Sequence, residues 1–346
     1  MQQHLRFCPF GQSRCGNWTM LHKGGPRLLV TDRQSALYLE RAHVNVEGDR
    51  VVFHAADDEL KRKYNIPHVN LAVLFIGQGT SITQAAMRLL GEEGVHLAVT
   101  GSGGTPLHMG GLTTYTATRH FREILPIYLS PDLSLIAAKT IMRDRTARMR
   151  KMGASAAGKW LQAREFEALK AACSDFETDL DTCTSLEQLL GFEGQFSKRC
   201  YAGFAALSGL AKGQIFRREA GAGEVADAAP GPVRLINRLI DHGNYLCYGM
   251  AGAALWALGI PPHLSIFHGK TRAGGLVFDL ADSFKDALVL PAAFSFARAK
   301  DVREAEHAFR ARMIDAFDDR QILKEAIASV DRMLEIATPE TEAHHA

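Results

Sequence analysis

The spacing of apolar residues changes once along this chain, and that change limits the folds it can adopt. From about residue 27 to 101, short runs rich in β-branched and apolar residues alternate with turn residues, as strands do. After the glycine-dense stretch GSGGTPLHMGG at 101–111, nearly every segment repeats its apolar residues with the 3.6-residue period of a helix. The sequence therefore predicts a β-rich part followed by a helical part.

The strand-like runs of the first part are RLLV, a hairpin from SALYLERAHVNV through the EGD turn to RVVFHA, then LAVLFIG and VHLAVTG. One helix interrupts them, SITQAAMRLLGEEG, in which Ser81 and Gln84 are spaced as a capping box. Gly77 and Gly79 precede this helix, as in a dinucleotide-binding loop. The position of the third glycine is Ile82, however, and no βαβ array is predicted, so a structural turn is favoured.

These patterns predict an α+β protein of two domains, because 346 residues exceed the usual size of a single core. We expect a small N-terminal β-rich domain over 1–103 and a larger all-α catalytic domain over 113–336. A glycine-rich linker over 104–112 would join them, and residues 337–346 would form a flexible tail.

Composition narrows the class of protein. The chain is 47% hydrophobic and 23% charged, with a net charge of +2 that neither requires nor excludes a nucleic-acid partner. No apolar run is long enough to cross a bilayer, and the N-terminus lacks the apolar stretch of a secretory signal. The six cysteines are scattered and fit no common zinc pattern. We expect a cytoplasmic protein with no membrane partner.

The stretch LSIFHGKTRAGGLVFDLADSFKDALVLP, at 264–291, carries the densest set of chemical groups. His268 ends an apolar run, and a glycine-broken loop with Lys270 and Arg272 follows it. Asp279 and Asp282 then stand three residues apart, which puts both carboxylates on one face of a helix. An imidazole with carboxylate oxygens and no thiolate favours Mg²⁺ or Mn²⁺ over zinc. This stretch therefore predicts a divalent-metal site that lacks one carboxylate.

Glu193 is the candidate for the missing carboxylate. It lies in a helical segment whose next polar residues include Lys198 and Arg199. Periodicity does not show that Glu193 meets His268, because the two are far apart along the chain. A solvent-exposed glutamate stays an alternative interpretation.

The two aspartates also have alternatives. Asp279 could cap the N-terminus of the following helix, where its carboxylate would accept backbone N–H bonds. Asp282 is therefore the favoured metal ligand of the two. Lys285 and Asp286 follow on the same predicted helix, where they could pair with neighbouring charges.

A basic segment precedes this region. Eight Lys or Arg residues lie between Lys139 and Arg164, within a helical pattern. Lys139, Arg143 and Arg150 fall near one face of that helix. The segment is either a solvated helix face or a track for an anionic polymer such as DNA.

Five stretches of the chain resemble those of the CRISPR-associated integrase family, Cas1, whose members insert new spacers into CRISPR arrays. Together they extend over roughly residues 60 to 300. The last motif looks like that of the subtype F branch of type I systems. The stretches are NIPHVNLAVLFIGQGTSITQAAMRLL, GSGGTPL, the Glu193 helix with EGQFSKR, NRLIDHGNYLCYG and HGKTRAGGLVFDLADSFKDALVLPAAF.

The resemblance implies a fold, a site and partners. It implies an N-terminal β domain and a larger helical C-terminal domain, in line with the change of periodicity. It implies a metal site whose glutamate, histidine and aspartate correspond to Glu193, His268 and Asp282, with Asp279 as the neighbouring catalytic acid and Mg²⁺ or Mn²⁺ as the ion. The partners that it implies are double-stranded DNA, as spacer precursor and as array, a second copy of the chain in a homodimer, and Cas2 or its fusion to the Cas3 helicase-nuclease.

The expected reaction is a DNA transesterification, in which the 3′-hydroxyl of a short duplex attacks a phosphodiester of the array. A divalent ion would polarise a phosphate oxygen and stabilise the leaving alkoxide. Basic side chains would hold the phosphates and position the DNA without reading its sequence. The candidates for this role are Arg143, Arg150, Lys198, Arg199, Lys270, Arg272 and Lys285.

Two other functions stay open at this point. The same ligands would serve a metal-dependent nuclease in which water replaces the DNA hydroxyl. A DNA-binding scaffold whose acids are structural would also account for the basic segment, although it gives no reason to gather His268 and two acids beside a basic loop.

Overall fold

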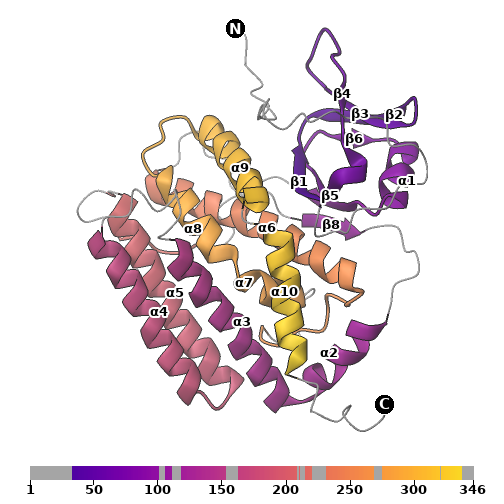
Figure 1. The fold of residues 1–346 in the computed structure, drawn as a ribbon. Coiled ribbons are helices and arrows are strands. Elements are labelled where there is room, and N and C mark those ends of the chain that lie inside the picture. Colours follow the sequence, from indigo (N-terminus) through magenta and orange to yellow (C-terminus); the bar gives the residue numbers. More distant parts are fainter. Residues whose placement is uncertain are drawn as a thin grey trace.

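The structure is a computed structural model that describes residues 33–100, 106–110, 118–152, 163–208, 210, 215–219, 231–268, 275–319 and 321–336. A small β-rich part lies at one end of a larger helical part (Figure 1). The strands come first along the chain and most of the helices after them. The α+β fold, with an N-terminal β-rich domain and a helical C-terminal region, is therefore confirmed.

The first sheet of the β-rich part has the strand order β1-β5-β7-β8. Its first three strands are parallel and the fourth is antiparallel. The helix α1 connects β5 to β7, so this part contains one βαβ unit, which the sequence did not predict. The strands are β1 (Gln34–Leu39), β5 (Leu71–Ile76), β7 (His96–Thr100) and β8 (Pro106–Gly110), and α1 is Gln84–Glu92.

The second sheet has the strand order β4-β3-β2-β6. The predicted EGD hairpin forms here, between the antiparallel strands β2 and β3. The SALYLE segment does not belong to it, because the chain turns at Arg41, whose φ is +49°, and sends this segment into the first sheet as β1. The strands are β2 (Ala42–Glu47), β3 (Arg50–Ala55), β4 (Tyr64–Asn65) and β6 (Ser81–Ile82), and a 3₁₀ turn, η2, is His68–Asn70.

The cap of α1 differs from the expected capping box. Ser81 is in the short strand β6, and Thr83 occupies the N-cap, where its hydroxyl oxygen accepts a hydrogen bond of 3.3 Å from the Ala86 N–H. The sequence offers three consecutive residues, Ser-Ile-Thr, of which two can cap a helix. Pairing of Ser81 with His43 in the sheet decides between them.

The helices of the second part agree in place with the periodic segments. The segment DLADSFKDALVLPAAFSFA, however, forms two helices, because the chain breaks at Ser283 and Phe284. The helices are α2 (Arg119–Leu129), α3 (Pro131–Met152), α4 (Ala163–Thr182), α5 (Leu186–Ser208), α6 (Pro232–Leu258), α7 (Gly275–Asp282), α8 (Lys285–Ser295), α9 (Val302–Asp319) and α10 (Ile322–Glu335).

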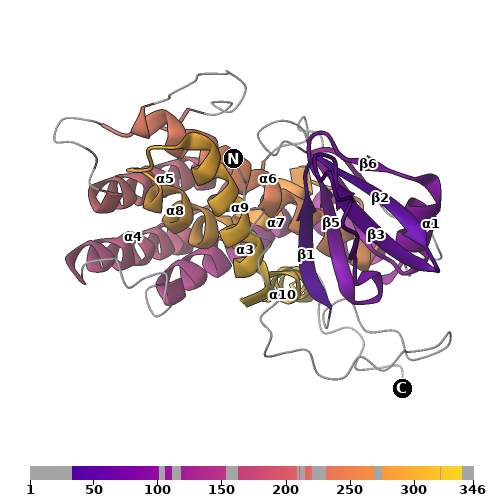
Figure 2. The same cartoon turned by 90° about the horizontal axis from the view of Figure 1, so that it is seen from above.

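The two parts share a hydrophobic core. All six residues of β5 are buried, which explains the unbroken apolar run LAVLFI. Val73 and Phe75 belong to the same cluster as the helical core, whereas Leu74 and Ile76 belong to a smaller cluster inside the β-rich part. Helices α6 and α9 contact the first sheet, as the view from above shows (Figure 2). The β-rich part therefore packs against the helices through a sheet that is covered on both faces.

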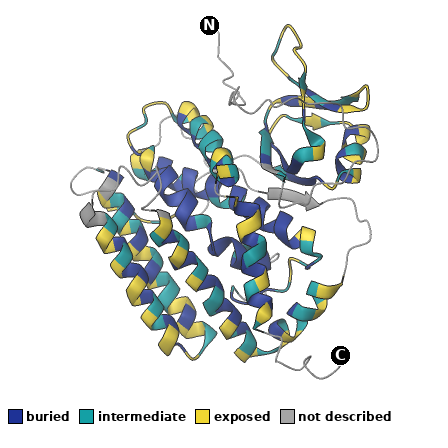
Figure 3. Ribbon diagram, in the orientation of Figure 1, coloured by how far each residue is buried: buried dark blue, intermediate teal, exposed yellow. Residues whose placement is uncertain are grey.

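Helix α6 is the centre of the helical part. Its residues from Leu235 to Leu255 are buried almost without interruption, and most of this stretch has the colour of buried residues in Figure 3. A helix that is apolar all round must have neighbours on every side. It contacts α7, α8, α9 and α10 as well as the first sheet.

The predicted domain limits meet the structure only in part. Residues 106–110, within the expected linker over 104–112, form the edge strand β8. The rest of that linker and the expected tail over 337–346 lie outside the described residues. The domain boundaries themselves stay a prediction.

Among the described residues, no single helix is long and apolar enough to cross a membrane. The helices α2 and α3 meet the criteria of length and composition only when taken as a pair, which is bent by 111° at its break.

Gly249 on α6 supplies a test of the contact between the two parts. A Cβ atom there would lie 2.3 Å from Cε1 of Phe75 on β5. We expect Gly249→Ala to lower the free energy of unfolding by about 1–3 kcal/mol, because a well-packed core has no room for the added methyl group. Urea denaturation measures the loss.

Gly203 on α5 is the matched control, since a Cβ atom there would have nothing within 4 Å. Gly203→Ala should stabilise its helix by roughly 0.5–1 kcal/mol. Adding Phe75→Leu to Gly249→Ala should recover part of the loss, because the two sites are in contact. Equal stability of Gly249→Ala and wild type would contradict this close packing.

Candidate functional site

A buried carboxylate holds the segment before α7 in place. Asp279 is fully buried on α7. Its Oδ2 accepts hydrogen bonds from the backbone N–H of Ile266, at 2.7 Å, and of Phe267, at 3.0 Å, and its Oδ1 accepts one from His268, also at 3.0 Å. The Ser265 hydroxyl donates to Oδ2 at 3.2 Å. Asp279 therefore satisfies a whole loop of otherwise unpaired donors.

This loop also packs closely on the start of α7. A Cβ atom at Gly275 would lie 2.4 Å from Cβ of Ser265, so only glycine allows the approach. The predicted role of Asp279 as a helix N-cap is wrong, because α7 begins four residues earlier, at Gly275. Asp279 instead caps the loop that lies against its own helix.

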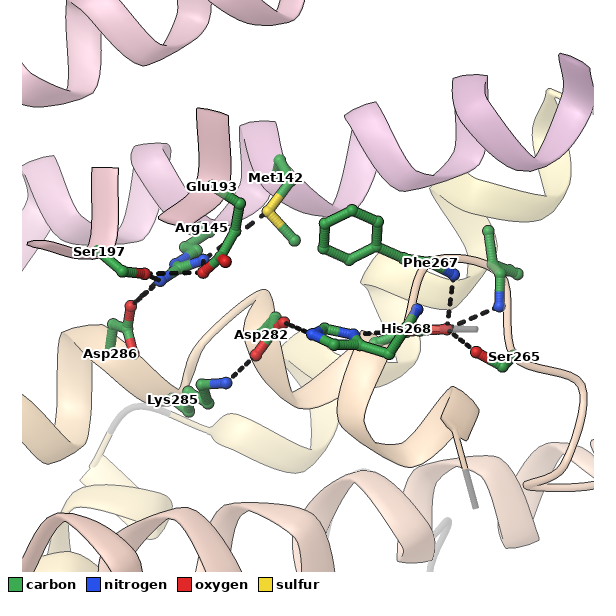
Figure 4. A network of polar contacts seen from close by, with 12 residues as sticks. Met142, Arg145, Glu193, Ser197, Ser265, Phe267, His268, Asp282, Lys285 and Asp286 are labelled. Atoms are coloured by element: carbon green, nitrogen blue, oxygen red, sulfur yellow. Dashed lines mark hydrogen bonds and ion pairs between the residues drawn. The ribbon is translucent and has the colours of Figure 1, made fainter. Parts of the chain in front are cut away.

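The imidazole of His268 has a defined orientation. Its Nδ1 lies 2.7 Å from Oδ1 of Asp279, and its Nε2 lies 3.4 Å from Oδ2 of Asp282 (Figure 4). The buried carboxylate of Asp279 favours a proton on Nδ1, which leaves the lone pair of a neutral ring on Nε2. Burial alone would lower the pKa of His268, but the bond to Asp279 and the charge of Asp282 outweigh burial and raise it.

Asp282 lies between the ammonium of Lys285 and the imidazole of His268. Its Oδ1 accepts a hydrogen bond from the Nζ of Lys285, and its Oδ2 faces His268. Oδ2 is buried and accepts no hydrogen bond from the described residues. Burial would lower the pKa of Lys285, but the charge of Asp282 raises it, so the ammonium stays charged. The free lone pairs of Oδ2 are where a cation would be accommodated.

Glu193 approaches the same region from α5. Its Oε1 accepts hydrogen bonds from Nη1 of Arg145 and from the Ser197 hydroxyl, both at 2.7 Å. Burial would raise the pKa of Glu193, but Arg145, Ser197 and the charge of Lys285 lower it to about 2. The charge of Lys285 thus acts on Glu193 as well as on Asp282, and the three side chains lie in one region of the helical part (Figure 4).

The residues present fit a divalent ion by chemistry and by charge. Within the described residues, no three His, Cys, Asp or Glu side chains stand close enough to hold a metal as they are. The carboxylates are instead compensated by Arg145 and Lys285. Four carboxylates carry four negative charges, and the two cations carry two positive ones. The net charge of −2 is what one divalent cation would neutralise. The negative side chains are Asp279, Asp282, Asp286 and Glu193.

The residues predicted from the sequence to form the site differ in where the structure places them. His268, Asp279, Asp282 and Lys285 form one connected network, and Glu193 belongs to the adjacent network around Arg145. Lys285 is largely buried against Asp282, so a contact with DNA would require it to leave that partner. Lys270 and Arg272 lie outside the described residues. The catalytic and metal-binding roles stay predictions.

The other basic candidates lie on α3 and α5, and three of them face the neighbouring helix α4. Arg143 pairs with Asp181 at 2.8 Å, Arg199 with Asp175 at 2.8 Å, and Arg150 with Glu177, all three acids being on α4. Lys198 is exposed. The basic residues predicted to bind DNA are thus paired in part with acidic residues of the neighbouring helix α4.

Sequence reasoning missed Arg145 and its ion pair with Asp286 on α8. Arg145 is 2% exposed and donates to both Glu193 and Asp286. A signal was present, because Ala137, Ile141, Arg145 and Met149 are spaced by four on the buried face of α3. An arginine on an apolar stripe indicates a buried charge that needs acidic partners.

Comparison with known proteins gives consistent matches. The family model described as CRISPR associated protein Cas1 matches residues 37–327. The CRISPR-associated endonuclease Cas1 of Pseudomonas aeruginosa is 36% identical over 316 residues, which cover 86% of this chain and 91% of that protein. The Cas1 of Pectobacterium atrosepticum is 33% identical over 323 residues, covering 88% and 93%.

Solved structures share the fold. A TtCas1–DNA complex has a TM-score of 0.53 at 25% identity, covering 88% of this chain and 97% of that one. A Cas1 protein from Thermotoga maritima has a TM-score of 0.66 at 15% identity, covering 90% and 99%. A Cas6-RT-Cas1–Cas2 complex has a TM-score of 0.62 at 14% identity, covering 89% of this chain and 35% of the other.

Asp279 should be more important for stability than an ordinary capping carboxylate. In Asp279→Asn, one of the two acceptor oxygens becomes an N–H donor, which leaves at least two buried donors unpaired. We expect the free energy of unfolding to fall by about 2–4 kcal/mol in urea denaturation.

Asp301→Asn is the matched control. Asp301 is exposed and accepts two backbone N–H bonds before α9, at 2.8 and 3.0 Å. Its replacement should cost less than about 1 kcal/mol. Equal losses in the two variants would contradict the role assigned to Asp279.

Proposed function

Because this chain belongs to the Cas1 family, we propose that it is a divalent-metal-dependent DNA integrase of CRISPR spacer acquisition. It would join the 3′-hydroxyl ends of a short duplex to the CRISPR array by transesterification. The observation that carries the proposal is the orientation of His268, whose Nε2 faces the partly unpaired carboxylate of Asp282.

Glu193, His268 and Asp282 would hold the ion. The chemistry that Mg²⁺ or Mn²⁺ supplies in such a site is polarisation of a phosphate oxygen and stabilisation of the leaving oxygen. Oxygen and imidazole donors suit both ions, and the histidine tilts the preference toward Mn²⁺. Asp279 contributes by keeping the proton of His268 on Nδ1, so that Nε2 is free to bind.

The reaction makes one P–O bond and breaks another. The 3′-oxygen of the incoming strand forms the new bond to phosphorus, and the bond from phosphorus to the array strand's own 3′-oxygen breaks. The attacking hydroxyl loses a proton and the leaving oxygen gains one, so no oxidant or covalent enzyme intermediate is needed. The protein therefore has to position two DNA ends and stabilise charge.

Basic side chains near the site would bind the DNA backbone. Lys270 and Arg272, which come between His268 and α7 in the sequence, and Lys285 would contact phosphates next to the reacting one. Arg143, Arg150, Lys198 and Arg199 would hold more distant phosphates along α3 and α5. Arg143 and Arg199 would exchange their α4 carboxylates for phosphates, which costs little at an exposed surface. Arg150 would have to leave Glu177 in a pair that is partly buried. The similar TtCas1 structure is a complex with DNA, which supports this assignment.

The reaction also implies an assembly. Two strands are joined at separate places, and a single chain would supply only one metal site. We therefore propose a homodimer, which would supply two. Cas2 is the proposed partner, since a similar chain occurs in a Cas1–Cas2 complex. The motif HGKTRAGGLVFDLAD supports the subtype F branch, in which Cas2 is fused to Cas3. Array DNA would place the protein in the cytoplasm.

Hydrolysis by water is the second candidate function, because the same residues would activate either nucleophile. The curated relatives are named endonucleases, which is the observation that favours it. A scaffold without catalysis is less well supported, since it gives no role to a buried carboxylate with an unpaired oxygen.

Removal of a proposed ligand should separate catalysis from DNA binding. We expect His268→Ala and Asp282→Ala to lose strand joining to a supercoiled plasmid, by at least about 100-fold, because the ion would lose one of its three protein donors. Binding of the short duplex, measured by fluorescence anisotropy, should change less than about threefold.

His263→Ala is the matched control for His268→Ala. His263 is exposed in the same segment, outside the network around Asp279. It should keep wild-type joining. Full joining by either ligand variant would discard the assignment.

The nature of the nucleophile should appear in the products. We expect a labelled duplex with 3′-hydroxyl ends to become joined to plasmid in Mg²⁺ or Mn²⁺, and a duplex with 3′-dideoxy ends not to, because only the former has an oxygen to attack with. Gel analysis of labelled plasmid measures joining. Plasmid cleavage at the same rate with both duplexes, without joining, would favour hydrolysis.

A further inference from the structure

Arg145 is the most deeply buried cation among the described residues of α3. Its side chain is 2% exposed and joins three helices. It donates to Glu193 and Ser197 on α5, each at 2.7 Å, and to Asp286 on α8 through Nε at 2.8 Å and also through Nη2. The guanidinium carbon lies 5.1 Å from the centre of the Phe196 ring. These contacts fix the plane of the guanidinium from every side.

The two oxygens of Glu193 are in different situations. Oε1 accepts from both Arg145 and Ser197, so its position is set by two donors. Both hydrogen bonds that Glu193 accepts from Arg145 and Ser197 go to Oε1 and none of them to Oε2, and the Glu193 side chain is 20% exposed. A carboxylate held through one oxygen turns its other oxygen in a defined direction. That oxygen is the one available to a ligand.

Because Asp286 also binds Arg145, the charge of Arg145 does not fully neutralise Glu193. Arg145 carries one positive charge and faces two carboxylates, Glu193 and Asp286. One negative charge is therefore left over, and of the two carboxylates Glu193 is the more exposed, at 20% against 6% for Asp286. A simple Arg–Glu ion pair would instead have cancelled the charge that attracts a cation.

We propose that Arg145 is a positioning residue that, together with Ser197 and Asp286, holds Glu193 so that Oε2 alone is presented to the divalent ion. This inference rests on the proposed metal site. Glu193 would then bind the ion through one oxygen. The adjacent Asp282 would do likewise through Oδ2, since its Oδ1 accepts from Lys285. Each of the two proposed carboxylate ligands thus has one oxygen held by a cation, the buried Arg145 or the largely buried Lys285.

Arg145→Lys tests the proposal, because lysine keeps the charge but replaces the planar guanidinium, which spans Glu193, Ser197 and Asp286, with one compact ammonium group. The measurement is the Kd for Mn²⁺ of the full chain by isothermal titration calorimetry, with no DNA present. We expect about 10- to 100-fold weaker binding, the range typical for loss of a group that orients a metal ligand. The rise in thermal midpoint on adding Mn²⁺ should shrink accordingly.

Arg332→Lys is the matched control. Arg332 forms a two-bond pair with Asp144, at 3.1 and 2.7 Å, also against α3. The same chemical change there should leave the Kd for Mn²⁺ as in wild type. If Arg145→Lys lowers the thermal midpoint of the metal-free protein yet binds Mn²⁺ as wild type does, Arg145 only joins helices and the proposal is wrong.

Ser197→Ala keeps the test decisive if Arg145→Lys does not fold. It removes one of the two donors to Oε1 and no charge, and we expect about 3- to 10-fold weaker Mn²⁺ binding. Wild-type affinity in Ser197→Ala would overturn the proposal. Absence of Mn²⁺ binding by the wild-type chain would instead overturn the metal site itself, together with this inference.

Discussion

The hydrogen bonds that Asp279 accepts are the constraint on which the site depends. A fully buried carboxylate is costly unless its lone pairs are occupied, and here five donors from the segment 265–268 occupy them. The same bonds fix the backbone that carries His268 and the proton position on its ring. A single side chain on α7 therefore determines where the segment lies and which nitrogen of His268 faces Asp282.

The two carboxylates proposed to bind the ion beside His268 are each paired with a cation through one oxygen. Asp282 is paired through Oδ1 with the largely buried Lys285, and Glu193 through Oε1 with the buried Arg145. Oδ2 of Asp282 accepts no hydrogen bond from the described residues. Buried ion pairs of this kind contribute little net stability, because removing both charges from water costs about as much as their attraction returns. Their presence is better explained by a function that needs excess negative charge in a confined place.

The sequence predicted the elements of this site better than their connections. His268, Asp279 and Asp282 are close along the chain, so helical spacing was enough to group the two acids. The start of α7 was placed too late because Gly275 resembles a loop residue, and this error gave Asp279 the wrong role. Arg145 comes from a distant helix and was found only in the structure. In the β-rich part, strand patterns were visible, but alternation does not specify partners, so β1 was assigned to the wrong sheet.

The sheet that is buried on both faces also restricts how this protein can be divided. Strand β5 contributes Phe75 to the helical core and Leu74 to the core of the β-rich part, and Phe75 lies against the backbone of α6 at Gly249. A fragment cut after β8 would expose one apolar face of the sheet to water, and the remaining fragment would expose α6. Neither half is thus expected to fold well when it is expressed alone. Exchange of one half between homologues would have to keep the contacts of β5 with both cores, residue by residue.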